Sequence, residues 1–301
     1  MTTISISLAH YHTTSLFPEL NLLKTIKMKK VILAFDGNHF SNGAMEFARR
    51  MNNHSPILLT GIFLPQLTYA NLWSYADSSG GAFNIPLIED SSAELVQENI
   101  GKFQDYCRQN EIQYKVHKDY LDFALPELKR ETRFADVLIL GGETFYRGFS
   151  KENRGEYMKE ALHSAECPVV IVPEKFEPPK LNIIAVDGSE SSLFALKQFS
   201  YLFGQFSQNR TLIVTTEDED EVSKKVMECV NELTRCHFPN FSLVRLTFDP
   251  GKYLSTWVEE KKASIFVSGS FGRSFWSRLV KKSFVSELIS DLTVPIFIAH
   301  R

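Results

Sequence analysis

The sequence predicts an α/β protein with two tandem, doubly wound parallel-sheet domains. Three observations lead to this fold class. Short runs of almost wholly apolar residues alternate with segments of helical period, and strands of that kind are buried on both faces of a parallel sheet. The whole alternation occurs twice along the chain. The length of 301 residues also fits two domains better than one.

The repeat is clearest at the first and last strands of each half. Residues 31–37 end in an Asp-Gly pair, and the same pattern returns 151 residues later at 183–188. The closing strand at 167–172, with its Pro followed by apolar residues, returns 127 residues later at 294–298. The first half therefore has about 24 additional residues, which we place in a long, aromatic-rich loop at 65–90. Loops of this length in compact domains are frequently functional.

Strands and helices are expected to alternate in each half. The strands are expected at 30–36, 56–63, 112–117, 136–141 and 168–172, and again at 181–187, 210–215, 242–247, 263–269 and 294–299. The helices are expected at 41–52, 91–109, 122–132 and 155–164, and again at 190–203, 219–235, 252–261 and 280–290. This order is typical of a sheet whose strands are joined by helical crossovers.

The same pattern sets the expected domain boundaries. The first domain is expected at 28–174 and the second at 181–301, with a short, Pro-rich and stiff linker at 175–180. Residues 1–27 have no clear period. We expect them to be an N-terminal extension that is disordered or is not part of the native protein, with Met28 as the alternative start.

Charge and composition exclude several classes of protein. The chain has 33 basic and 36 acidic residues and a net charge of −3, so no overall field attracts DNA or an anionic membrane. No apolar run approaches the roughly 20 residues that span a bilayer, and the first 30 residues contain no stretch of signal-peptide type. Four cysteines without CxxC or Cys/His ligand spacing argue against a zinc site. We expect a cytoplasmic protein with reduced, partly buried cysteines.

Motifs of known enzymes are missing. The sequence contains no Walker A motif, no G-x-G-x-x-G, no HExxH and no G-x-S-x-G. No residue is therefore assigned a catalytic role, and none is assigned to a metal. The acidic run at 217–221 opens a predicted helix, where acidic groups complement the helix dipole.

Each half has an Asp at the end of its first strand, followed by Gly and by the start of a helix. These residues are Asp36 in the first half and Asp187, with Gly188, in the second. One interpretation is a ligand site, because ligands in such folds bind beyond the carboxyl ends of the strands. The other is that Asp and the serines after it cap the first helix.

A glycine turn follows the fourth strand of the second half. Glycine lets backbone N–H groups approach a phosphate closely, and a following helix start adds donors and a favourable dipole. The alternative interpretation is an ordinary glycine turn beside a solvated basic face. The candidate phosphate-binding residues are Gly269, Ser270, Gly272, Arg273, Lys282 and Ser283.

These features together resemble a tandem universal stress protein over residues 28–301. The resemblance rests on the strand-Asp-Gly openings, the strand and helix order, the glycine turn and the Pro-apolar closing strands. It implies a universal-stress-protein/adenine-nucleotide α-hydrolase-like fold with two pseudo-twofold related domains. It also implies that the closing strands at 168–172 and 294–299 pair within the chain, and it leaves room for a homodimer of whole chains.

Members of this family that bind ATP have the pattern G-x2-G-x9-G-[S/T] after strand four. The second half matches at Gly269, Gly272 and Ser283, but Lys282 replaces a glycine. The first half has Phe145 and Glu156 at two of the four positions, where a bulky ring and a carboxylate are unfavourable for phosphate. We therefore expect a degenerate first-domain site. Its remaining family positions are Asp36, Gly142 and Gly155.

The resemblance also places Asp187 on the adenosine side of the pocket and a backbone contact to adenine near Val214. It implies a stress-response protein that binds ATP or AMP, with or without Mg²⁺, in the second domain. Because no base is positioned, ATP hydrolysis is expected to be slow at most. One alternative is a regulatory or interaction module that has lost nucleotide binding, as Lys282 and the aromatic loop suggest. Another is an ATP pyrophosphatase, but the S-G-G-x-D-S loop of those enzymes is missing.

Overall fold

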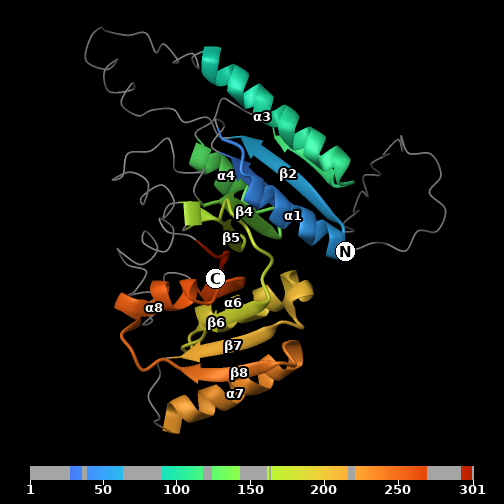
Figure 1. Cartoon of the computed structure of the whole chain (residues 1–301). Coiled ribbons are helices and arrows are strands. Elements are labelled where there is room, and N and C mark those ends of the chain that lie inside the picture. The colour runs from blue at the N-terminus through green and yellow to red at the C-terminus, as the bar shows by residue number, and fades with distance from the viewer. Residues whose placement is uncertain are drawn as a thin grey trace, which may run out of the picture.

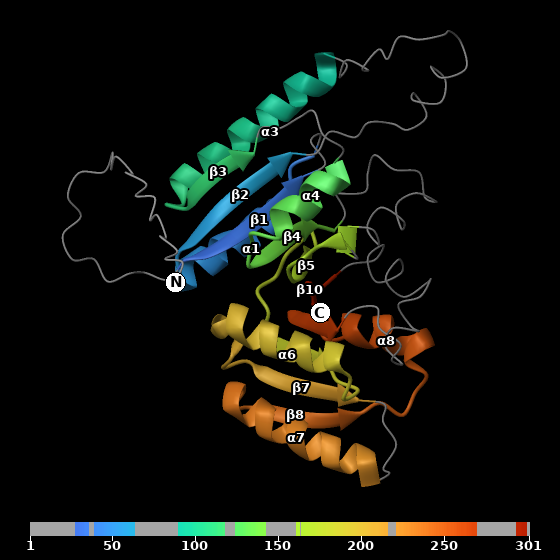
Figure 2. The same cartoon turned by 180° about the vertical axis from the view of Figure 1, so that it is seen from behind.

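The computed structural model describes residues 28–35, 39–63, 90–117, 124–142, 161–162, 164–215, 221–269 and 293–299. These residues form one ten-stranded sheet with helices on both faces (Figures 1 and 2). The strand order is β3-β2-β1-β4-β5-β10-β9-β6-β7-β8. In each half the chain first moves outward from the opening strand and then crosses to its other side. The order therefore reverses between β1 and β4, and again between β6 and β9.

The observed elements agree closely with the predicted ones. Each strand and helix whose bounds are given below begins and ends within two residues of its predicted bounds. The strands are β1 Lys29–Phe35, β2 Ile57–Phe63, β3 Gln113–His117, β4 Val137–Gly141, β5 Val169–Val172, β6 Leu181–Ala185, β7 Arg210–Thr215, β8 Phe241–Arg245, β9 Ser264–Gly269 and β10 Ile296–Ala299. The helices are α1 Asn42–His54, α3 Asp90–Gln109, α4 Ala124–Thr132, α6 Glu190–Leu202, α7 Glu221–His237 and α8 Pro250–Glu259, with a short 3-10 turn η2 at Gly204–Phe206. Residues 65–89 of the predicted loop at 65–90, the predicted helix at 280–290 and most of the predicted helix at 155–164 lie outside the described residues.

All neighbouring strands within a half are parallel, and the two halves meet through one antiparallel pair. In that pair, β10 lies against β5 with Ile296 opposite Ile171 and Ile298 opposite Val169. These are the two closing strands of the repeat. Every residue of β5 and β10 is buried, so either strand alone would be an apolar, unpaired edge. Their pairing removes both edges and makes the strands of the two halves run in opposite directions.

The sheet has a hydrophobic core on each face because successive strand residues point to opposite sides. In β1, for example, Val31, Leu33 and Phe35 belong to one core and Ile32 and Ala34 to the other. The first core is covered by α1 and α3 from the first half and by α6 and α7 from the second. The second core is covered by α4 and α8. Each core therefore continues across both halves.

A group of phenylalanines joins the halves on the first face. Phe47 of α1 packs edge-on against Phe203, which follows α6, with ring centroids 5.7 Å apart. It packs in the same way against Phe176 of the connecting segment, at 5.4 Å. Phe203 in turn contacts Phe297 of β10 at 5.6 Å. The connecting segment is therefore packed into the core and is not a free tether.

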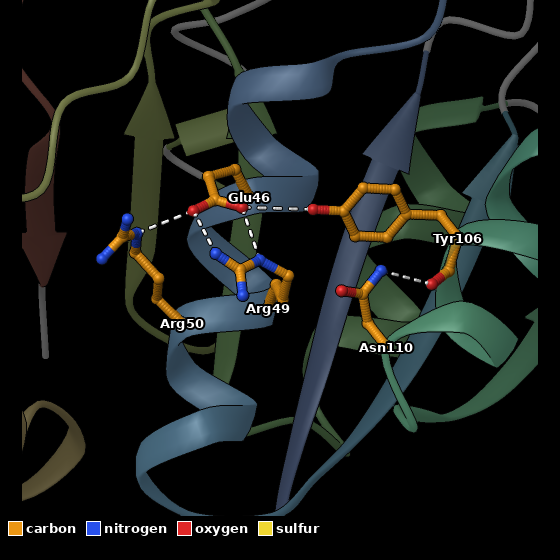
Figure 3. A network of polar contacts seen from close by, with 5 residues as sticks. All are labelled: Glu46, Arg49, Arg50, Tyr106 and Asn110. Atoms are coloured by element: carbon orange, nitrogen blue, oxygen red, sulfur yellow. Dashed lines mark hydrogen bonds and ion pairs between the residues drawn. The ribbon is translucent and has the colours of Figure 1, made fainter.

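A polar network fastens α3 to α1 (Figure 3). The Glu46 carboxylate accepts hydrogen bonds from Arg49 at 2.6 and 2.7 Å and from Arg50 at 2.8 Å. The Tyr106 hydroxyl of α3 donates to the same carboxylate at 3.3 Å. The hydrogen bonds from Arg49 hold the pKa of Glu46 below its usual range. The Asn110 side chain donates to the Tyr106 carbonyl at 2.8 Å and closes the end of α3.

We predict that Gly43→Ala destabilises the protein by about 1–3 kcal/mol, the usual cost of overpacking. A methyl group at Gly43 would overlap the Pro173 carbonyl oxygen and lie 2.8 Å from that of Glu174, and these are backbone atoms that cannot turn away. The matched control is Gly101→Ala in α3, where nothing lies within 4 Å of the new methyl. Loss of helical glycine should make that variant more stable by about 0.5–1 kcal/mol. Denaturant unfolding measures both, and equal effects would contradict the close contact.

We also predict a pH-dependent contribution from Glu46. Its pKa is lower in the folded than in the unfolded state, so its stabilisation is complete above the pKa of the unfolded state. The stabilisation is lost as the pH falls through the folded value. Glu46→Gln should therefore lower the free energy of unfolding at pH 7 and approach the native protein in strong acid. The control is Glu98→Gln, in the exposed Glu98–Lys102 pair, which should change little. If Glu46→Gln lowered the free energy of unfolding equally at pH 7 and in strong acid, the charge of Glu46 would not be the source of the stabilisation.

Candidate functional site

In the second half, the carboxyl ends of β6 and β9 meet the start of α6. Asp187 lies just beyond β6, and its Oδ1 accepts hydrogen bonds from the Ser189 N–H at 3.1 Å and from the Ser189 hydroxyl at 2.6 Å. The carboxylate is thereby held at the N-terminus of α6. This is the switch point of the second half, where ligands of doubly wound sheets bind.

The capping interpretation is confirmed for the serine and is compatible with a site at the aspartate. Ser189 is the N-cap of α6, and its Oγ accepts from the Ser192 N–H at 3.2 Å. The Ser192 hydroxyl donates to the Ser189 carbonyl at 3.0 Å and accepts from the Asp187 N–H at 3.4 Å. Ser189 therefore caps the helix, and Asp187 holds Ser189 in place.

Gly188 is required by the backbone. Its φ is +73°, in the left-handed region that favours glycine. A Cβ at this position would also lie 2.6 Å from Cγ1 of Val226, on the inner side of α7. The Asp-Gly pair of the sequence motif thus sets a tight turn between β6 and α6, and it brings α7 next to that turn.

Gly269 ends β9 directly against the first turn of α6. A Cβ there would lie 2.5 Å from the carbonyl carbon of Ser191 and 2.6 Å from the nitrogen of Ser192. Strand and helix backbones therefore approach each other as closely as glycine alone permits. The other residues of the expected phosphate loop lie outside the described part of the chain: Ser270, Gly272, Arg273, Lys282 and Ser283.

Val214 lies in the neighbouring strand β7, where it is paired with Ala185 of β6. Its side chain is completely buried, and its carbonyl accepts from the Val186 N–H at 2.9 Å. An adenine contact at Val214 would therefore use the backbone and would share that carbonyl with the sheet. The structure brings Asp187, Gly188 and Gly269 to one place, with Val214 beside them in the sheet.

The first half is built differently at the same position. Gly142 is buried just after β4, and its N–H donates to the Val172 carbonyl at 2.8 Å. Asp36 and Gly155 lie outside the described residues. The N-cap of α1 is Ser41, which aligns through the 151-residue repeat with Ser192, inside the first turn of α6. Helix α1 therefore begins about one turn later than α6.

The carboxylate of Glu174 occupies the start of α1. One of its oxygens accepts from the Asn42 N–H at 3.0 Å and from the Asn42 side-chain amide at 2.9 Å. The other accepts from the Ser41 hydroxyl at 3.0 Å. An anion at a helix N-terminus is favoured by the helix dipole and by the unpaired N–H groups. Sequence reasoning missed Glu174 because the residue lies more than 130 positions from the helix that it caps.

Other chemistry is sparse among the residues described. No three His, Cys, Asp or Glu side chains in the described ranges lie together as metal ligands do. No helix there has the length and apolar character needed to cross a membrane. Burial raises the pKa of the Cys107 and Cys167 thiols to about 12. Cys229 and Cys236, which were expected to be partly buried, are exposed on α7.

We predict that Glu174→Gln lowers the free energy of unfolding by about 1 kcal/mol, the usual contribution of a helix cap and its favourable charge. The amide keeps the shape of the side chain but removes the charge and one acceptor. The control is Glu177→Gln, at an exposed position three residues further along the same segment. If both variants unfold at the same denaturant concentration as the native protein, the Glu174 contact is not stabilising.

The fold is similar to that of solved universal stress proteins. One from Archaeoglobus fulgidus DSM 4304 aligns with a TM-score of 0.64 and 18% identity, over 91% of this chain and 96% of that chain. A protein from Pseudomonas aeruginosa UCBPP-PA14 that is assigned as a universal stress protein aligns with a TM-score of 0.53 and 10% identity, over 91% and 93%. A protein of unknown function from Pseudomonas aeruginosa PAO1 aligns with a TM-score of 0.52 and 9% identity, over 91% and 92%.

Comparison of the sequence itself gives no assignment, because no protein-family model and no curated protein matches it. The structural likeness extends over nearly the full length of each of these solved chains. The chain therefore has the fold of the tandem universal stress proteins.

Proposed function

We propose that this chain is a cytosolic stress-response protein that binds an adenine nucleotide, ATP or AMP, in its second half. The observation that carries the proposal is the difference between the two switch points. In the second half, Asp187, Gly188 and Gly269 gather at the start of α6. In the first half, the protein's own Glu174 occupies the start of α1.

The second switch point suits an adenosine group. Asp187 offers a fixed carboxylate that is able to accept from a ribose hydroxyl, and its partner Ser189 keeps it in place. The side chains at the strand ends beside it, Val186 and Val214, are fully buried, so an adenine base would contact these strand ends through their backbone. The family resemblance assigns Asp187 and the backbone near Val214 to this group.

The phosphate group is assigned from the sequence pattern. Gly272 and Ser283 keep the family's glycine and hydroxyl positions, and Arg273 and Lys282 add positive charge. These residues follow Gly269, whose contact with α6 fixes where the loop begins. Mg²⁺ would accompany ATP through the phosphate oxygens, since the described residues offer no ligand cluster of their own.

We propose one site per chain, in a second domain at 181–301, with a first domain at 28–174. Glu174 neutralises the start of α1 and would repel a phosphate there. The residue 127 positions later is Arg301, which carries the opposite charge. The first half also has Phe145 and Glu156 at family phosphate positions. Because the sequence analysis assigns no catalytic base, binding and signalling with slow hydrolysis at most suit the protein better than rapid turnover.

A second candidate function is an interaction module without nucleotide. The specific observation in its favour is Lys282, which replaces a glycine of the family motif. A non-glycine residue is strained wherever the backbone requires positive φ, so Lys282 could obstruct the loop. Its ammonium could equally hold a phosphate as a point charge. The two candidates are separated by one binding experiment.

We predict that the purified chain releases an adenine nucleotide on denaturation, or that Mg-ATP or AMP raises its melting temperature. A ligand at 100 times its dissociation constant adds about 2.7 kcal/mol of stability, which a thermal shift detects readily. Gly272→Val should abolish the shift while leaving the melting temperature of the free protein nearly unchanged. The matched control is Gly155→Val in the first half, which should leave the shift intact. Mass spectrometry of the released small molecules identifies the nucleotide.

The outcome for Lys282 then follows from the same assay. If Lys282 contacts phosphate, Lys282→Gly weakens the shift, and if it obstructs the loop, the shift grows. Absence of both nucleotide and shift in the native chain would reject the binding proposal in favour of the interaction module.

A further inference from the structure

The outer face of α7 carries two exposed thiols. Cys229 and Cys236 are free and exposed, whereas the other two cysteines, Cys107 and Cys167, are buried. Helix α7 lies at the outer end of the second half, next to the edge strand β8 (Figures 1 and 2). Its inner side packs into the core through Val230 and Thr234. The two thiols thus lie on the exposed side of a helix whose opposite side is packed into the core.

Two stripes of side chains run along this face. Cys229 and Cys236 are seven residues apart, close to two full helical turns. Their directions around the helix axis differ by only about 20°, so they lie on one stripe. Glu228 and Arg235 have the same spacing and form a second stripe about 100° around the helix. Glu232 lies between the stripes, and all five side chains are exposed. The second stripe borders a shallow hollow of about 470 Å³ that is lined by Glu228, Asn231, Glu232, Arg235 and Cys236.

We infer that this face is an interface with a second copy of the chain, in which the two α7 helices pack antiparallel across a twofold axis. Such an axis sets each stripe against the same stripe of the other copy. A register that places Cys229 beside Cys236 of the second copy also places Glu228 beside Arg235 of the second copy. The register that is ideal for the cysteine pair and the register that is ideal for the charged pair differ by two residues, about 3 Å along the helix. One arrangement of the helices therefore brings both pairs close together.

The charges of the face favour this antiparallel arrangement over a parallel one. A parallel pairing about a twofold axis would set the charged stripe of each copy against the thiol stripe of the other, so Glu228 and Arg235 would have no opposite charge across the interface. The antiparallel pairing makes two opposite-charge contacts instead. Glu232 then lies near the twofold axis, opposite Glu232 of the second copy, and these two carboxylates repel each other. Arg235 of the second copy lies three residues further along the helix and offsets this repulsion. Exposed pairs of this kind set orientation and give little affinity, so we expect a weak dimer under reducing conditions.

Oxidation would convert the weak dimer into a covalent one. Hydrogen peroxide oxidises one thiol to a sulfenic acid and is reduced to water. The thiol of the second copy then attacks that sulfur, a disulfide forms, and a second water leaves. Each disulfide consumes one peroxide, and the symmetric dimer forms two. The geometry is accessible because a disulfide requires Cα atoms about 4.4–6.8 Å apart, within reach of helices in contact.

The test uses the full-length chain, reduced and then exposed to hydrogen peroxide, with the products separated under non-reducing conditions. The native chain should give a covalent dimer, and peptide mapping should find Cys229 joined to Cys236. Cys229→Ser alone and Cys236→Ser alone should each lose the dimer completely, because the partner thiol is missing. An equal mixture of the two variants, combined before oxidation, should regain a dimer through its one remaining pair.

The charge stripe gives an independent readout. Arg235→Glu should reduce the yield of covalent dimer, and adding Glu228→Arg should restore it, because the pair is then reversed in both copies. A dimer formed by either single cysteine variant alone would show pairing of like cysteines and overturn the antiparallel register. Absence of a dimer in the oxidised native chain would overturn the interface itself. Neither result depends on nucleotide binding.

Discussion

The antiparallel pairing of β5 with β10 is the constraint on which the rest of the architecture depends. Each half brings one fully buried closing strand, and neither strand tolerates water along its edge. Their union makes ten strands into one sheet and fixes the two halves in opposite directions. Because of that reversal, α1 and α6 lie on the same face and share a core. The contact of Phe47 with Phe203 is therefore a consequence of the strand pairing.

The same junction accounts for the asymmetry between the repeats. The chain leaves β5 through Pro173 and Glu174, and these residues run across the start of α1 so closely that Gly43 is needed there. The segment contacts the start of α1, which begins about one turn later than α6. Glu174 then supplies the negative charge that the shortened helix start favours. The connection between the halves thus covers the start of α1, and the start of α6 is the candidate site.

Local pattern predicted most of the fold and only part of the site. Apolar strands and helical periods reflect short stretches of sequence, so their boundaries were found within two residues. The Asp-Gly turn was found for the same reason, because it needs only neighbouring residues. Glu174 and the contact of Tyr106 with Glu46 join residues 60 or more positions apart, and no periodicity reports such contacts. The exposure of Cys229 was also missed, because an apolar residue type on the outer side of an amphipathic helix leaves no trace in composition.

Helix α7 connects the two surfaces to which we assign a role. Its inner side touches the candidate nucleotide site, where Val226 lies against the Asp-Gly turn at Gly188. Its outer side carries the thiols and the charge stripe. A displacement at one side of a packed helix moves the whole helix, because close-packed core side chains are hardly compressible. Coupling between two sites is a single free energy and is reciprocal. A nucleotide that moves α7 through Val226 must therefore change the dimer equilibrium by the same factor by which dimerisation changes nucleotide affinity.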